Sequence, residues 1–350
     1  MKKVLLIATL FVTSFGYAQD ITPFTPNSLN DGVVYYLPKT AIDIEVTATK
    51  ITYAPGDLCQ YASRYLRLNN VSAQADVHWE IKEVKVSSAG IPDPDNAYMV
   101  KVKDKDVASN VQLSKDGIVL AINAKVDIED ETGPKATSPA TKKLDPKKYL
   151  TEEILSTTST AKMADLVAKE IYSIRESKNS LIKGQAEYMP KDGAAMKLML
   201  DNLEEQEQAL TQMFAGTTTR EDQTLHFYIT PEDQMKDQIA FRFSRRLGIV
   251  KADDLSGAPV YISMESVDPI PTLDPKTAEK KKKMEGVIYN IPGKARVTVR
   301  SVEKQYFKGE LPVTQFGTTE VLVNDLFKNK VNTRVIFHPQ TGAIQKIDKD

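Results

Sequence analysis

The chain has few of the residues that cross-link exported proteins or build metal sites. Among 350 residues there are one cysteine, one tryptophan and three histidines. The single cysteine, Cys59, excludes an intrachain disulfide, so burial alone must hold the fold. We interpret it as a small buried residue, not a reactive thiol. Because His78, His226 and His338 lack H-x-x-x-H spacing, no metal site is predicted.

The chain also lacks an excess of charge of either sign. Its 46 basic and 47 acidic residues give a formal net charge of −1. This balance predicts neither a nucleic-acid-binding surface nor a strongly acidic one. A hydrophobic fraction of 41% with 27% charged residues is typical of a globular chain.

Long hydrophobic runs are absent after residue 18, so no transmembrane anchor is predicted. Residues 1–18 have the pattern of a secretory signal peptide: Lys2 and Lys3, an apolar run, then a small-residue cleavage site before Gln19. The run is shorter than the roughly 20 residues that span a bilayer, and no cysteine follows it for lipid attachment. The sequence predicts an exported protein, periplasmic or associated with the cell envelope.

A repeated segment is the main internal pattern. The segment GVVYYLPKTA at 32–41 aligns without a gap onto GVIYNIPGKA at 286–295. Each copy predicts a short strand that ends at its proline, Pro38 or Pro292, because proline donates no ladder hydrogen bond. One interpretation is duplication, in which the two ends of the chain are related β modules. The alternative is coincidence, since this pattern is common where strands end.

Strand patterns surround both copies. Alternation from Val77 to Val86 slips at Lys82-Glu83, which predicts a bulge. The Asp116-Gly117 pair predicts the turn of a hairpin, because glycine readily takes a positive φ. Both features indicate antiparallel sheet.

Two helices are predicted in the middle of the chain. The first covers about 159–177 and carries one apolar stripe. The second begins after Asp192 as N-cap and ends at Gly216. Its methionine-rich stripe is interpreted as core and not as a flexible partner surface. The acidic run 204–207 is interpreted as the solvated face.

These patterns predict an α+β fold dominated by β structure, with two antiparallel β-rich modules and a helical hairpin inserted between them. The predicted parts after the signal peptide are an N-terminal β-rich module at 19–127 and a linker at 128–148. The helical hairpin at 149–216 and a C-terminal β-rich module at 217–350 follow. The linker is assigned because prolines and charged residues leave it little apolar surface to bury.

Several segments resemble one exported family. They lie at 32–41, 231–232, 241–244, 257–262, 315–317 and 339–344, with helical counterparts at 174–177, 190–193 and 214–216. The family is the exported Bacteroidetes group called domain of unknown function 4831. The resemblance covers nearly the whole chain after residue 18 and implies an envelope location in a Gram-negative bacterium. It implies no activity, cofactor or catalytic residue.

Catalytic motifs are few and isolated. Ser159 to Lys162 matches the S-x-x-K pattern of penicillin-recognising enzymes, and Ser180 to Lys183 matches it again. Neither match has an S-D-N or K-T-G partner, so both are interpreted as chance. Nucleophile-elbow, phosphate-loop and dinucleotide motifs are absent. No catalytic residue and no cofactor is predicted.

One basic patch is the candidate ligand site, formed by Arg242, Arg245 and Arg246. Strand alternation predicts that Phe241 and Phe243 are buried while Arg242 faces the other side. Three guanidinium groups near one strand end suit a carboxylate or phosphate. The alternative is structural pairing with the abundant acidic residues.

The sequence favours a non-enzymatic binding or assembly component of the envelope, with an unknown envelope protein or glycan as partner. The alternative is a hydrolase of envelope glycan or peptide with dispersed acidic residues. A cleft lined by two or three convergent carboxylates or histidines with perturbed pKa would favour the enzyme.

Overall fold

The computed structural model describes residues 22–23, 32–101, 111–127, 144–268, 286–323, 326 and 333–349. The predicted signal peptide and residues 128–143 of the predicted linker lie outside the described residues.

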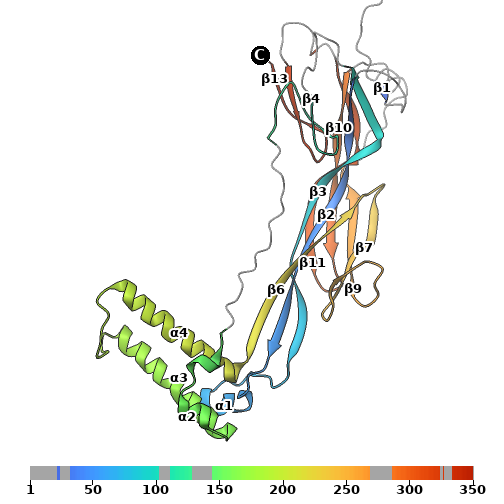
Figure 1. Cartoon of the computed structure of the whole chain (residues 1–350). Helices are drawn as coiled ribbons and strands as arrows, with labels where there is room; N and C mark the ends of the chain where they lie inside the picture. The colour runs from blue at the N-terminus through green and yellow to red at the C-terminus, as the bar shows by residue number, and fades with distance from the viewer. Residues whose placement is uncertain are drawn as a thin grey trace, which may run out of the picture.

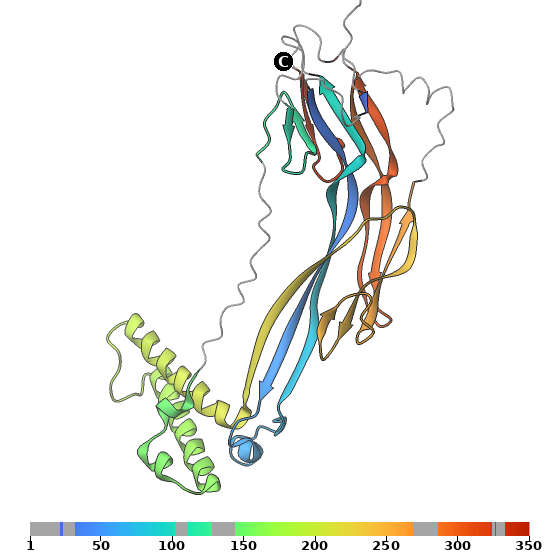
Figure 2. The ribbon, with the colours of Figure 1, turned by 45° about the vertical axis from the view of Figure 1, so that its right-hand side comes forward.

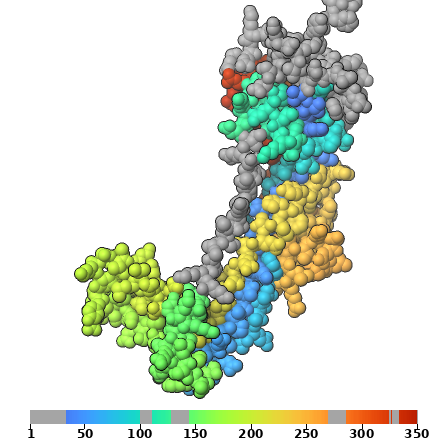
Figure 3. All heavy atoms as spheres, in the orientation of Figure 1, coloured from blue at the N-terminus to red at the C-terminus, as the bar shows by residue number. Residues whose placement is uncertain are grey.

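The molecule is elongated, with a body of β-sheets at one end and a helical unit at the other (Figure 1). Three long strands connect the ends: β2 (Gly32–Ala54), β3 (Asp76–Lys101) and β6 (Thr217–Ile229). Figure 2 shows them running from the β body down to the helices. In the space-filling view the helices stand to one side of the strands (Figure 3). The helical unit is therefore held away from the β body.

Three antiparallel sheets make up the β structure, and the prediction of a β-dominated α+β fold is confirmed. The first has the order β1-β3-β2-β6 and the second β11-β10-β9-β7-β8. The third has the order β13-β12-β5-β4. The remaining strands are β1 (Thr22–Pro23), β4 (Val111–Leu113), β5 (Val119–Ile122), β7 (Met235–Ser244), β8 (Gly248–Val250), β9 (Ala258–Ser266), β10 (Gly286–Arg300), β11 (Gln305–Val323), β12 (Thr333–Phe337) and β13 (Ile344–Lys349).

The first two sheets pack into a sandwich with one hydrophobic core. Alternate residues of β2 from Ile42 to Ala48 face Phe241, Ile262 and Val297 of the second sheet. Phe241 is fully buried, and its ring stacks on Phe227 with centroids 5.2 Å apart. This core fixes how the end of β6 sits against the second sheet.

The prediction that the repeated strands end at their prolines is wrong. β2 continues through Pro38, and β10 continues through Pro292. The ladder loses register next to Pro38 in β2 and at Pro292 in β10. Leu37 faces residues 93–96, while Pro38 pairs with Pro92, and Pro292 faces residues 314–317. The extra residues of the partner strand form a bulge, and the strand continues past its proline.

Each repeat also contacts a short hairpin that follows it. The backbone N–H of Tyr36 donates to the carbonyl of Gly117 at 2.9 Å, and that of the aligned Asn290 donates to the carbonyl of Gly342 at 3.2 Å. Both glycines have positive φ, 83° and 67°, in the turns β4–β5 and β12–β13. The Asp-Gly hairpin prediction is thereby confirmed. Lys82 is also the unpaired residue of a register shift, as the sequence slip predicted.

The helical unit contains α1 (Ala62–Leu66), α2 (Glu152–Ser156), α3 (Thr160–Ile182) and α4 (Gly193–Ala215), with short 3-10 turns η1 (Cys59–Tyr61) and η2 (Pro146–Tyr149). The predicted caps of α4 are confirmed. The Asp192 carboxylate accepts from the backbone N–H of Ala195 at 2.7 Å, and Gly216 takes φ 76° beyond the last turn. None of the described helices is long and apolar enough to span a bilayer.

The helices bury a core of their own. Leu58 and Ala62 pack against α3 and α4, with Ile171, Leu210 and Phe214 fully buried. This largely agrees with the stripe predicted as core, although Met199 is 41% exposed.

The packing crosses the module boundaries drawn from the sequence. β6, from the range 217–350, pairs along its whole length with β2 of the range 19–127. Residues 58–66 of that first range pack with the helices of 149–216. The division into 19–127, 128–148, 149–216 and 217–350 stays a prediction.

Candidate functional site

The candidate site is a cavity of about 520 Å³ between the end of β6 and the end of β8. Leu225, Phe227 and Ile249 give it apolar walls. Lys251 and Asp254, in the loop after β8, line it with two opposite charges. Its volume falls within the range of about 300–1,000 Å³ typical of ligand pockets. We call this cavity the β6/β8 cleft.

The β6/β8 cleft lies beside the outermost strands of two sheets. Leu225, His226 and Phe227 are consecutive, as are Ile249, Val250 and Lys251, and all six line it. β2 occupies the other edge of β6 and β7 that of β8. Among the described residues no further strand pairs with the outer side of β6 or β8, so the cleft lies between the edge strands of two sheets.

Arg242 holds the loop that lines one side of this cleft. Its Nε donates to the carbonyl of Ala252 at 2.8 Å, and a terminal nitrogen donates to the carbonyl of Gly257 at 3.0 Å. Alternation along β7 places it as predicted, because Phe241 is buried and Phe243 packs against the sandwich core. The guanidinium donates to backbone carbonyls, whereas the sequence suggested an anionic ligand or acidic side chains as its partners.

The other two arginines of the predicted patch lie in the exposed turn between β7 and β8. The carbonyl of Arg245 accepts a hydrogen bond from the backbone N–H of Trp79 at 2.7 Å. The backbone N–H of Arg246 donates to Ser244 at 3.3 Å. The turn is thus tied to β3 by its backbone. Binding of an anion by the three arginines stays a prediction.

Charged and titratable groups have partners on both sides of the cleft. Hydrogen bonds from the Ser256 hydroxyl and backbone N–H lower the pKa of Asp254, and the charge of Arg242 adds to the effect. The Nδ1 atom of His226 lies 3.0 Å from the carboxylate of Asp43, across the ladder on β2. Asp254 is therefore ionised at neutral pH.

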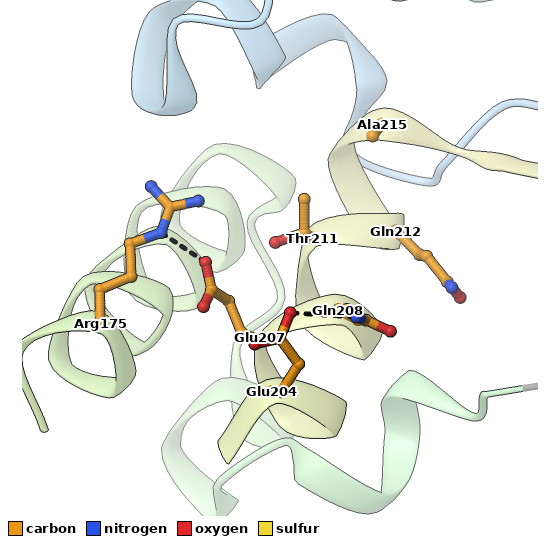
Figure 4. A pocket seen from close by; sticks show the side chains of 7 residues that line it. All are labelled: Arg175, Glu204, Glu207, Gln208, Thr211, Gln212 and Ala215. Carbon is orange, nitrogen blue, oxygen red and sulfur yellow. Dashed lines mark hydrogen bonds and ion pairs between the residues drawn. The ribbon is translucent and has the colours of Figure 1, made fainter. Parts of the chain in front are cut away.

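A second cavity, of about 370 Å³, lies on the helical hairpin and holds two carboxylates (Figure 4). Glu207 accepts from Nε of Arg175 at 2.6 Å and from Nζ of Lys178 at 3.0 Å. Lys178 also donates to Glu204 at 2.7 Å. The interpretation of this acidic run as a solvated face is wrong at Glu207, whose side chain is only 18% exposed. Glu204 and Glu207 are three positions apart, so the helical period places both on the side of α4 that meets Lys178 of α3.

The pKa directions at these carboxyls argue against acid catalysis there. Burial alone raises the pKa of Glu207, but hydrogen bonds from Arg175 and Lys178 outweigh burial and hold it below its usual value. The hydrogen bond from Lys178 lowers the pKa of Glu204 in the same way. Both groups are ionised at neutral pH, whereas the general acid of a glycoside hydrolase needs a raised pKa. The cluster serves to join α3 to α4.

This cluster predicts an acid-sensitive helical unit. A carboxyl whose pKa is lowered by folding stabilises the folded state above its unfolded pKa, and that contribution disappears as pH falls through the folded pKa. We expect urea midpoints followed by circular dichroism at 222 nm to fall below about pH 4.3. Glu207→Gln should cost about 1–3 kcal/mol at pH 7 and weaken this acid dependence. Glu187→Gln, in the exposed α3–α4 loop, is the control and should change neither. Equal acid profiles for all three proteins would contradict this role of Glu207.

A third cavity, of about 400 Å³, lies where the two proline bulges meet. Its polar groups bond to one another: Nε2 of Gln315 donates to the carbonyl of Thr40 at 2.8 Å, and Nδ2 of Asn290 donates to the carbonyl of Pro38 at 2.9 Å. The first hydrogen bond joins β11 to β2, and the second joins the two repeated strands, β10 and β2. We therefore assign this cavity a structural role.

The remaining motif residues have separate local partners. Ser159 caps α3, while Lys162 pairs with Asp165 at 3.4 Å, so this S-x-x-K match forms no serine–lysine pair. His78 lies 2.6 Å from Asp76, and Cys59 is half-buried in η1. Within the described ranges, no group of three or more His, Cys, Asp or Glu residues is arranged to hold a metal ion.

Comparison with known families supports the resemblance read from the sequence. The family model described as a domain of unknown function, DUF4831, matches residues 31–345. The chain belongs to the DUF4831 family. The match spans both repeated strands, the helical hairpin and the β6/β8 cleft, so in this DUF4831 chain all of them lie within the family domain. No curated protein and no solved structure matches the chain.

Proposed function

We propose that this DUF4831 protein is a non-enzymatic binding or assembly component of the bacterial cell envelope, and that the β6/β8 cleft is its binding site. One observation carries the proposal: a cavity with apolar walls lies between β6 and β8, two edge strands that pair with no further strand in the described part of the chain. Free edges offer unpaired backbone groups to another protein. The apolar walls add surface whose burial favours association.

Export is part of the proposal. It rests on the signal-peptide pattern of residues 1–18 and on the resemblance to an exported Bacteroidetes family. The proposed location is the periplasm or the envelope of a Gram-negative bacterium. N-terminal sequencing of the exported form should begin at Gln19, and retention of Met1 would contradict the proposal.

The hydrolase alternative receives less support from the site geometry. The pocket that holds two carboxylates keeps both ionised through Arg175 and Lys178. The β6/β8 cleft has one carboxylate in its lining, that of Asp254, and its pKa is lowered. Neither described arrangement contains a protonated carboxyl opposite an ionised one, the pair that glycoside hydrolysis requires.

Site-specific photo-crosslinking tests the proposal in the native host. A photoreactive amino acid at Val250, in the cleft lining, should give discrete adducts with an envelope protein. The matched control is Val302, which is 81% exposed and outside that lining. Adducts at Val250 that are absent at Val302 are the expected result. No adducts at Val250, or the same adducts at both positions, would contradict the cleft as binding site.

A further inference from the structure

Resting on the proposed function, we infer that the partner enters the β6/β8 cleft as an extended peptide. The peptide adds an outer strand to β6 and places apolar side chains from alternate positions into the cavity. Its main chain supplies affinity through ladder hydrogen bonds, and its alternate side chains supply specificity.

The edge of β6 is built for pairing. All thirteen residues of β6 pair with β2, from Ile229 opposite Ile42 to Thr217 opposite Ala54, without a register shift. Proline, bulges, very short strands and charged side chains commonly protect sheet edges. β6 has none of the first three, and its charged residues Arg220, Glu221 and Asp222 lie outside the segment 223–229 that reaches the cleft. Within the described part of the chain, no strand pairs with its outer edge. This regular edge presents backbone donors and acceptors with which no described strand pairs.

The apolar walls of the cavity favour one residue pattern in the strand that pairs with that edge. Leu225 and Phe227 are two positions apart on β6, so their side chains share one face, and that face is directed to the sandwich core. An added strand runs beside them with the same period of two. Its side chains on that face meet Leu225, Phe227 and Ile249, whereas those between them point to solvent. Apolar residues at alternate positions are therefore the complementary pattern.

The β6 strand of a second copy fits this site poorly. Residues 217–222 of β6 read TTTRED, whereas 225–229 read LHFYI. Because β6 ends at Ile229, two antiparallel β6 strands align their apolar segments only over residues 225–229, and any longer overlap places the polar half of one beside the apolar half of the other. Threonine and charged side chains then face the apolar walls, which costs desolvation without compensating hydrogen bonds. A partner strand of different sequence avoids this mismatch.

A library of random twelve-residue peptides, selected against the full chain, tests the inference. We expect enriched peptides with apolar residues at alternate positions. Their affinity should fall at least tenfold for Val250→Arg and for Lys251→Trp, and should stay unchanged for Val302→Arg. Lys251 is exposed, so its variant blocks the rim of the cleft without disturbing the buried face. Peptides that bind both cleft variants normally would overturn the inference.

N-methylation of each amide in a selected peptide separates strand addition from other binding. In a strand, alternate amides point toward the edge they pair with. Methylation should abolish binding at every second position and leave the intervening positions within about threefold. Cleft-dependent binding without this alternation would exclude strand addition and leave the proposed function intact.

Failure of both peptide selection and crosslinking at Val250 would overturn the inference and the proposed function together. A dimer of the purified chain that Val250→Arg dissociates would identify a second copy as occupant and overturn the inference.

Discussion

Phe241→Ala is expected to lower the free energy of unfolding by about 3–5 kcal/mol, as is typical when a fully buried phenylalanine is truncated. Phe241 has no exposed surface and stacks on Phe227, which lines the β6/β8 cleft. The substitution removes contacts on both sides of the sandwich and leaves a cavity that the two sheets fill only in part. The wall of the cleft formed by Phe227 loses its support at the same time.

Urea unfolding followed by tryptophan fluorescence measures this effect. Trp79 is the only tryptophan, and it packs against the sandwich core. Leu255→Ala is the control, because Leu255 is 83% exposed and its truncation should change stability by less than about 0.5 kcal/mol. A loss below about 1 kcal/mol for Phe241→Ala would mean that the sandwich is not the core that positions the cleft.

Phe214→Ala is expected to destabilise the helical unit by a similar amount, about 3–5 kcal/mol. Phe214 is fully buried among Leu58, Ile171 and Leu210, in a core separate from that of the sandwich. Ellipticity at 222 nm should therefore be lost at lower urea concentration, while the Trp79 fluorescence transition moves less. Separate transitions are expected because the two cores share none of their residues.

The control for the helical unit lies on the same helix. Leu198 is 62% exposed, so Leu198→Ala removes surface that water already contacts and should leave both transitions in place. If Phe214→Ala shifts fluorescence and ellipticity equally, the two cores unfold as one unit. The helical unit would then not be an independent part of the molecule.

Features set by a few neighbouring residues could be predicted from the sequence. The caps of α4 follow from Asp192 and Gly216, whose preferences act within one helical turn. The bulge at Lys82 follows from a slip in alternation, and the hairpin at Asp116-Gly117 from glycine's positive φ. The structure agrees with these three predictions because each depends only on the backbone preferences of neighbouring residues.

Features that depend on distant pairing could not be predicted. The β6/β8 cleft forms only when β6 pairs with β2 and β8 pairs with β7. The first pairing joins residues about 180 positions apart in the chain, such as Asp43 and His226. The bulges at Pro38 and Pro292 were also missed, because proline excludes a ladder hydrogen bond without showing whether the strand ends or continues. The role of Arg242 depends on carbonyls of a loop ten to fifteen residues away.

Duplication of one β unit stays our hypothesis for the two ends of the chain. It is supported by the one-against-four bulges, which lie one position apart in the alignment, and by the hydrogen bonds from Tyr36 and Asn290 to the turns of short hairpins. The partner strands on the other side, β6 and β9, also end within one position of each other when Ala41 is aligned with Ala295. The neighbouring strands and hairpins in these contacts lie outside the ten residues that suggested the repeat.

Hydrogen exchange with and without a selected peptide tests the β6/β8 cleft most directly. Strand addition protects amides on the outer edge of β6, so mass spectrometry of the full chain should show slower exchange in 217–229 and 248–250. Exchange in α3 and α4 should stay unchanged. Protection confined to the helical hairpin, or absent from β6 at saturating peptide, would contradict the assignment of the cleft as the binding site.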